Sequence, residues 1–133
     1  MVPTFIHLRF ENRWNFPHAL GAIDGKHVTI RKPSNAGSFY FNYKKTHSVI
    51  LMAIAGPSYE CLWADVGCNG RNNDGGVWNK SALQKGIEDG TIKFPERAAL
   101  LGNEDLMPYV FLGDDAFALK TYMMKPYPRS LTI

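Results

Sequence analysis

The sequence has few cysteines, no long apolar run and no low-complexity segment. Its two cysteines, Cys61 and Cys68, do not form a C-x-x-C pair, and their spacing gives no zinc signature. No stretch approaches the roughly 20 apolar residues that span a bilayer, and charges interrupt the N-terminal segment too early for a signal peptide. We therefore expect two reduced thiols in preference to a disulfide, no membrane partner, and a protein of the nucleus or the cytosol.

The composition is that of an ordinary folded domain. Of the 133 residues, 45% are hydrophobic, 20% are charged and 13% are aromatic, which argues against disorder. The net charge of +3 is compatible with a nucleic-acid partner but does not require one. A chain of this length predicts one domain, placed at residues 17–133. Residues 1–16 form a residual N-terminal segment with the pattern of a helix end, closed by Pro17.

Four segments have the pattern of β-strands: residues 22–31, 48–55, 59–66 and 109–112. The second is an apolar run typical of a strand buried on both faces. The G-P-S connection after it predicts an antiparallel hairpin, since a parallel crossover needs a dozen or more residues. We therefore expect a mixed sheet and not a doubly wound parallel one.

The helices are expected between and after the last two strands. Val77, Leu83 and Ile87 give partial helical spacing over residues 76–89, and Gly90 is a plausible stop. A short helical turn is predicted over residues 95–101, and a further helix near Ala116. The order β-β-β-α-β-α is that of an α/β domain.

Several acids lie beside glycines near the ends of these segments. Asp24 lies in GAIDGKH, Asp74 in GRNNDGG, and Asp114 and Asp115 in FLGDDAF. A strand end presents a carboxylate to a metal with little freedom left, and Mg²⁺ prefers such oxygen ligands. The alternative is that each aspartate is a turn residue; Asp74 is the most turn-like and Asp24 less so. Asp65, at the end of the third strand, is interpreted as structural.

Basic and aromatic residues follow two of these segments. Lys26 and His27 come two and three residues after Asp24, and the stretch FYFNYKKTH at residues 39–47 interleaves aromatics with Lys44 and Lys45. Such a pattern can stack bases and bind phosphates. A solvated basic face, and aromatics that belong to a core, remain equally consistent with it.

Four ordered blocks carry a resemblance to a known family. They are WNFPHALGAIDGKHVTIRKP, FYFNYKKTHSVILMAIAG, ADVGCNGRNNDGGVWNKSAL and FLGDDAFALKTYMMKPYP, which together run from residue 14 to residue 128. The chain is similar to the PIF/Harbinger transposases and the nucleases derived from them. The resemblance implies an RNase H-like mixed sheet whose first three strands form a meander. It also implies metal-dependent DNA cleavage with Mg²⁺ or Mn²⁺, and a separate Myb-like DNA-binding partner protein.

The same resemblance assigns roles to particular residues. Asp24, Asp74 and Asp114 fall on the acids of the family's blocks, as catalytic and metal-binding residues, and Asp115 is only a neighbour. The residues expected to contact DNA come from the basic and aromatic pattern described above, and they are Lys26, His27, Lys44 and Lys45. No small-molecule cofactor beyond the metal is implied.

The chain departs from the family's pattern after Asp114. The family's catalytic Glu lies in a later basic helix, whereas no acid follows Asp115 and the chain ends at Ile133. We expect a truncated core that lacks its C-terminal part, with an apolar sheet face left uncovered and poor solubility or a need for a partner as a consequence. Two functions follow: a metal-dependent DNA nuclease or transposase core, or an inactive remnant that binds DNA or a partner protein. A phosphatase-like metal hydrolase is a weaker third.

Overall fold

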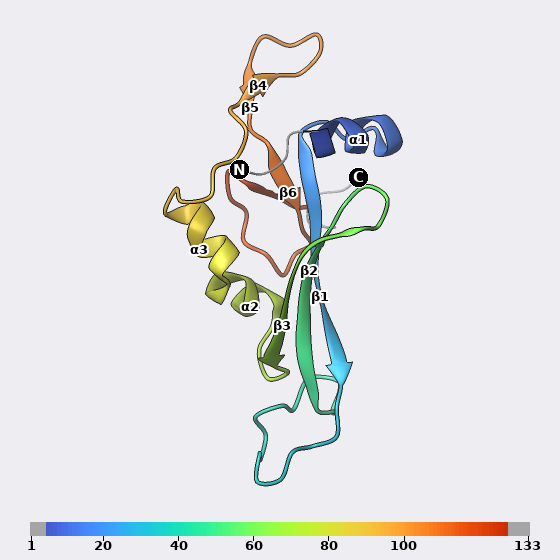
Figure 1. The fold of residues 1–133 in the computed structure, drawn as a ribbon, viewed down its shortest axis with the longest axis vertical. Coiled ribbons are helices and arrows are strands. Elements are labelled where there is room, and N and C mark those ends of the chain that lie inside the picture. The colour runs from blue at the N-terminus through green and yellow to red at the C-terminus, as the bar shows by residue number, and fades with distance from the viewer. Residues whose placement is uncertain (1–4, 128–133) are drawn as a thin grey trace.

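The structure, a computed structural model, describes residues 5–127. Its main sheet is built from β1 (Ala19–Thr29), β2 (Ser48–Ala55), β3 (Cys61–Asn69), β6 (Val110–Leu112) and β7 (Met123–Met124). The strand order is β3-β2-β1-β6-β7, with β1 to β3 antiparallel and with β6 and β7 added in parallel (Figure 1). This mixed α/β sheet confirms the expected fold class and is consistent with an RNase H-like domain.

The strand pattern of β2 follows its sequence closely. Ile50, Met52 and Ile54 are fully buried, and the residues between them are half-buried. The strand is therefore covered completely on one face and partly on the other, instead of equally on both as its apolar run predicted. The predicted hairpin to β3 is confirmed, and β3 extends beyond residue 66 because Gly67, with φ 112°, forms a bulge there.

Two short helices replace the one predicted over residues 76–89. They are α2 (Asp74–Lys80) and α3 (Ala82–Glu88), separated by Ser81 in an extended conformation. The Ser81 hydroxyl accepts a hydrogen bond from the Gln84 amide and donates one to the Trp78 carbonyl. Serine is a favoured N-cap, so this residue ends one helix and starts the next.

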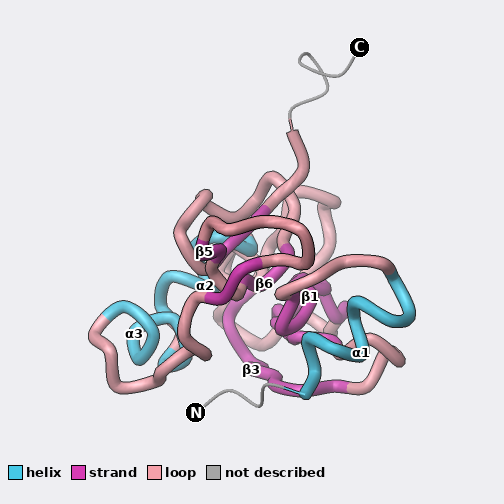
Figure 2. The backbone as a smooth tube through the Cα atoms, turned by 90° about the horizontal axis from the view of Figure 1, so that it is seen from above, coloured by secondary structure: helices cyan, strands magenta, loops and turns pink. Residues whose placement is uncertain are grey.

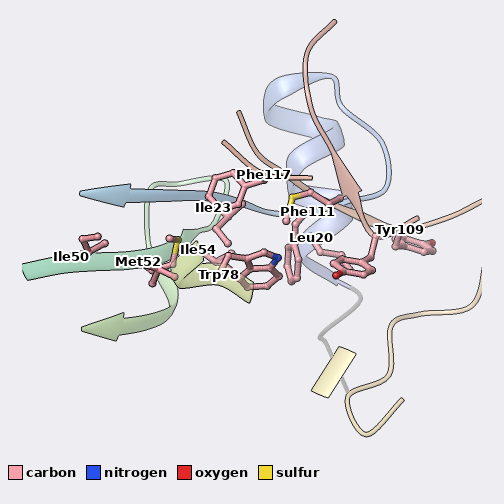
Figure 3. Close-up of a cluster of buried hydrophobic side chains, with 12 residues drawn as sticks. Leu20, Ile23, Ile50, Met52, Ile54, Trp78, Tyr109, Phe111 and Phe117 are labelled. Atoms are coloured by element: carbon pink, nitrogen blue, oxygen red, sulfur yellow. The ribbon is translucent and has the colours of Figure 1, made fainter. Parts of the chain in front are cut away.

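Helices pack on both faces of the sheet, but α1 (Phe5–Trp14) reaches only the start of β1, so apolar side chains such as Val66 stay exposed as expected for a partly uncovered face (Figure 2). On one face, Val77 and Trp78 of α2 pack against buried side chains of β1, β2 and β6, as Figure 3 shows for Trp78. On the other face, Ile6 and Phe10 of α1 pack against Ala19. The predicted N-terminal helix is thus present and docked on the sheet.

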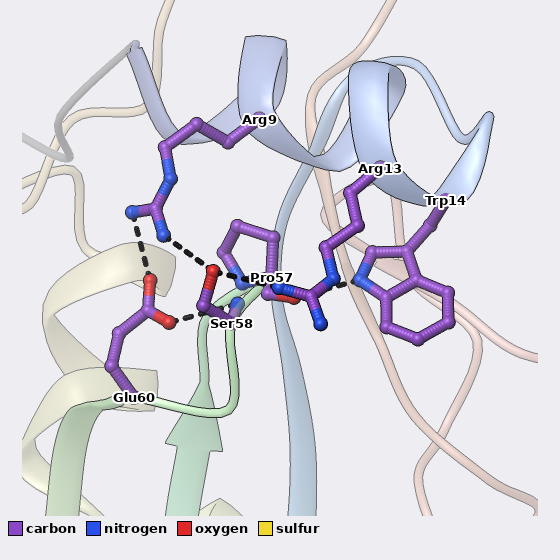
Figure 4. Close-up of polar contacts among 6 residues, drawn as sticks. All are labelled: Arg9, Arg13, Trp14, Pro57, Ser58 and Glu60. Atoms are coloured by element: carbon purple, nitrogen blue, oxygen red, sulfur yellow. Dashed lines mark hydrogen bonds and ion pairs between the residues drawn. The ribbon is translucent and has the colours of Figure 1, made fainter.

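Polar contacts fix α1 to the turn between β2 and β3 (Figure 4). The Trp14 indole donates to the Pro57 carbonyl at 2.8 Å, and Arg9 pairs with Glu60 at 2.9 Å. The Arg9 guanidinium also donates to the Ser58 hydroxyl. These contacts tie α1 to the hairpin end of β2 and β3.

Two other predictions about helices are wrong. Residues 95–101 do not form a helical turn; β4 (Ala98–Ala99) pairs with β5 (Leu106–Met107) in a projecting hairpin. No helix follows Ala116 within the described residues: a turn inserts Phe117 into the core, and the chain then enters β7. Among the described helices, none has the length and apolar character needed to cross a membrane.

Candidate active site

The predicted acids gather where β1 loses its neighbour on one side. β6 pairs with β1 only as far as Ala22 and Leu112, although β1 continues along β2 to Thr29. Asp24 on β1 and Asp114 in the turn after β6 each lie two residues beyond that last pair of the two parallel strands. The register therefore brings two residues that are far apart in the sequence to the same open edge.

Asp74 reaches this edge from α2. It is the first residue of the helix, and Asn73 caps it by accepting a hydrogen bond from the Gly76 amide at 2.7 Å. Gly75 lies so close to the Ala116 carbonyl that a side chain could not be accommodated there. The start of α2 is thus wedged beside the turn that follows β6. Asp74 is a helix residue and not the turn residue that its N-N-D-G-G context suggested.

Gly25 makes the close approach of Asp74 possible. A Cβ atom at this position would collide with the Asp74 carboxylate. The Gly25 amide donates to Asp24 Oδ1 at 2.9 Å, and it also lowers the pKa of Asp74 by hydrogen bonding. The Gly25 amide therefore lies between Asp24 and Asp74. Only glycine fits at this position, because any side chain would overlap the Asp74 carboxylate.

The charges at the site act on one another. Burial raises the pKa of Asp74 above its usual value, and the negative charges of Asp24 and then Asp114 raise it further. His27 and the Gly25 amide oppose this shift. Asp24 and Asp114 are exposed, whereas Asp74 is half-buried. Asp74 thus lies within electrostatic reach of both of the other predicted acids.

The donor set suits a divalent cation, but the acids do not enclose one. Within residues 5–127, no three His, Cys, Asp or Glu side chains stand close enough together to form a ready-made metal site. Mg²⁺ commonly uses only one or two protein carboxylates and completes its shell with water and substrate phosphate. A cation would also offset the repulsion that raises the pKa of Asp74. The residues therefore fit a shared, open site.

A cleft of about 370 Å³ adjoins the acids. Asp74 and Gly25 form part of its wall, and three of the four residues predicted to contact DNA also line it: Lys26, His27 and Lys44. The fourth, Lys45, does not line the cleft; it occupies a left-handed position in the adjacent turn, with φ 64°. The cleft thus combines cationic side chains with the acidic edge.

A buried polar network that the sequence did not reveal holds one side of the cleft. The Ser48 hydroxyl is fully buried; it accepts a hydrogen bond from Asn42 Nδ2 at 2.8 Å and lies 2.7 Å from His27 Nδ1. The Asn42 side chain also binds the Lys44 and Thr46 amides. An asparagine four residues before a threonine predicts such a turn only weakly, and the link to His27 depends on strand pairing.

The other two aspartates considered in the sequence, Asp65 and Asp115, are not part of this site. Asp65 of β3 pairs with Met52 of β2, so β2 separates it from β1. Asp115 is exposed beside Asp114.

Comparison with known protein families identifies a relationship. The family model described as DDE superfamily endonuclease matches residues 23–131, which include the three acids and the cleft. No curated protein and no solved structure matches the chain.

Proposed function

The chain belongs to the DDE superfamily endonucleases, and from this we propose that it is the core of a metal-dependent nuclease that cuts DNA phosphodiester bonds. The observation that carries the proposal is the meeting of Asp24, Asp74 and Asp114 at the open edge of β1, where burial and the charges of Asp24 and Asp114 raise the pKa of Asp74. Like charges brought together at an exposed strand edge favour a cation and, through it, a phosphate.

The three aspartates would hold Mg²⁺ or Mn²⁺. When bound, such ions would supply charge stabilisation at phosphorus and would lower the pKa of water. The protein itself positions the carboxylates. Asp24 lies on β1, Asp74 begins α2, and Asp114 lies in the turn after β6. Lys26 and Lys44 line the adjoining cleft, where they would hold the DNA backbone.

Nicking of supercoiled DNA by the purified chain, titrated with Mg²⁺ or Mn²⁺, tests the proposal. We expect nicking that falls about 100-fold or more in Asp24→Asn and in Asp114→Asn, the scale on which loss of one transition-state contact acts. Asp65→Asn, on the far side of β2, is the matched control and should cut like the parent chain. Absence of nicking at every metal concentration would overturn the nuclease proposal for this chain.

A second function is compatible with the same observation, that the acids do not form a closed ligand set among residues 5–127. In this alternative the chain is an inactive relative of transposases that binds DNA or a partner protein. DNA binding that persists without any metal-dependent nicking would support it.

The PIF/Harbinger-type blocks support two further proposals. The chain would work with a Myb-like DNA-binding protein, and it would act in the nucleus. Co-purification with such a protein, and the location of a tagged chain in cells, test these two points separately.

A further inference from the structure

The turn between β1 and β2 presents an aromatic side chain in an unusual setting. Tyr43 is 78% exposed, although it is next to Asn42, which is 4% exposed and held by several hydrogen bonds. An exposed tyrosine on a mobile loop would lose entropy on binding, whereas this one is carried by a turn whose backbone is already fixed. Figure 1 shows this loop at the end of the sheet remote from α1.

Tyr43 lines the same cleft as Asp74, together with a second ring. The ring centroids of Tyr43 and His27 are 5.6 Å apart with an interplanar angle of 73°, so the two rings form an angled wall. The contact between His27 and Ser48 fixes the second ring from behind. A flat ligand ring can stack on one of these walls and meet the other edge-on.

Two lysine side chains near the rings could bind the phosphate of such a ligand. Lys44 Nζ lies 5.6 Å from the centroid of the Tyr43 ring, and Lys26 lines the same cleft. The cleft volume of about 370 Å³ is at the low end of the 300–1,000 Å³ typical of small-ligand sites. It suits one nucleotide and not a base pair.

We propose that this cleft binds a single unpaired nucleotide of the DNA substrate, with its base stacked on the Tyr43 ring and edge-on to His27, and with its phosphate beside Lys26 and Lys44. The inference rests on the proposed nuclease function and narrows its substrate: the DNA next to the cleavage point is frayed, gapped or single-stranded instead of fully paired. Stacking on an aromatic ring accepts any base, so the preference is for an unpaired structure and not for a sequence.

Equilibrium binding of fluorescently labelled DNA, measured by anisotropy in EDTA, tests this without any cleavage. A blunt duplex is compared with the same duplex carrying a single-stranded tail. We expect tighter binding of the tailed duplex, and a loss of about 5- to 150-fold in its affinity in Tyr43→Ala, as expected for one stacked base. Tyr43→Leu should lose the preference as well, because it keeps bulk but no ring, whereas Tyr43→Phe should retain it.

Phe39→Ala is the matched control, since Phe39 is an exposed aromatic of the same loop that does not line the cleft. It should keep the preference for the tailed duplex. Equal affinity of the parent chain for both duplexes, or a preference that survives in Tyr43→Ala and Tyr43→Leu, would overturn the inference while leaving blunt-duplex binding, and with it the proposed function, in place. Failure to bind any DNA would overturn both.

Discussion

Asp74 is the acid of the site whose pKa is raised, and its protonation should therefore change the free energy of unfolding with pH. Its pKa is raised, so the folded state binds this proton more tightly than the unfolded state. Stability should therefore fall as the pH rises from the ordinary aspartate pKa of 3.8 through the raised value, and stay lowered above it. We expect Asp74→Asn to gain up to about 1 kcal/mol at neutral pH without metal, since solvent screens a half-buried group.

Denaturant unfolding in EDTA at a series of pH values measures this difference. Asp89 provides a control of opposite sign, because hydrogen bonds from Thr91 lower its pKa. Asp89→Asn should therefore be less stable than the parent chain at neutral pH, and the difference should disappear as the pH falls. An Asp74→Asn variant whose stability runs parallel to that of the parent chain at every pH would contradict the charge arrangement described here.

At the same scale, the sequence identified the acids but not the residues that surround them. Each predicted acid stands beside a glycine in a distinctive sequence block, so the sequence alone identifies them: Asp24, Asp74 and Asp114. The contact between His27 and Ser48 follows from the pairing of β1 with β2 across a long loop. Such a contact depends on strand register, which local sequence does not specify.

At the scale of secondary-structure elements, the break between α2 and α3 can be tested directly. Ser81 is 2% exposed, and its hydroxyl both caps α3 and bonds the Trp78 carbonyl. Ser81→Ala should cost about 0.5–2 kcal/mol, the range for loss of an N-cap. The urea midpoint of unfolding measures it.

Asn79→Ala, on the exposed side of α2, is the comparison variant and should change stability by less than about 0.5 kcal/mol. A Ser81→Ala chain that is equally stable and more helical by circular dichroism would mean that residues 74–88 prefer one continuous helix. That result would restore the helix expected from apolar spacing alone.

Elements with strong local patterns were predicted well, and those formed by long-range pairing were not. β2 has the predicted bounds because an eight-residue apolar run ends at Gly56 and Pro57. β7 has two residues and exists because it pairs with β6, so the segment after Ala116 was assigned to a helix. The β4–β5 hairpin was missed for the same reason: its strands are two residues long.

At the scale of the whole molecule, the modest net charge of +3 predicts DNA binding that depends on a local patch. The logarithm of the affinity should fall linearly with the logarithm of salt concentration, with a slope of about −0.9 for each phosphate contacted. Lys26→Gln and Lys44→Gln should each reduce the steepness by about one contact. Lys93→Gln, an exposed lysine that does not line the cleft, should leave the slope unchanged, and a loss equal in all three variants would contradict a local patch.

The order of the strands also has a consequence for how the protein folds. β1, β2 and β3 are consecutive in the chain, whereas β6 joins β1 only after the intervening helices and the β4–β5 hairpin. Closing that longer loop costs more chain entropy, so we expect the meander to form early and β6 to dock late. Asp24 belongs to the early part, and Asp114 arrives with the late part. A chain caught partway through folding would therefore hold Asp24 without Asp114 beside it, and the acids would come together only as the last strands are added.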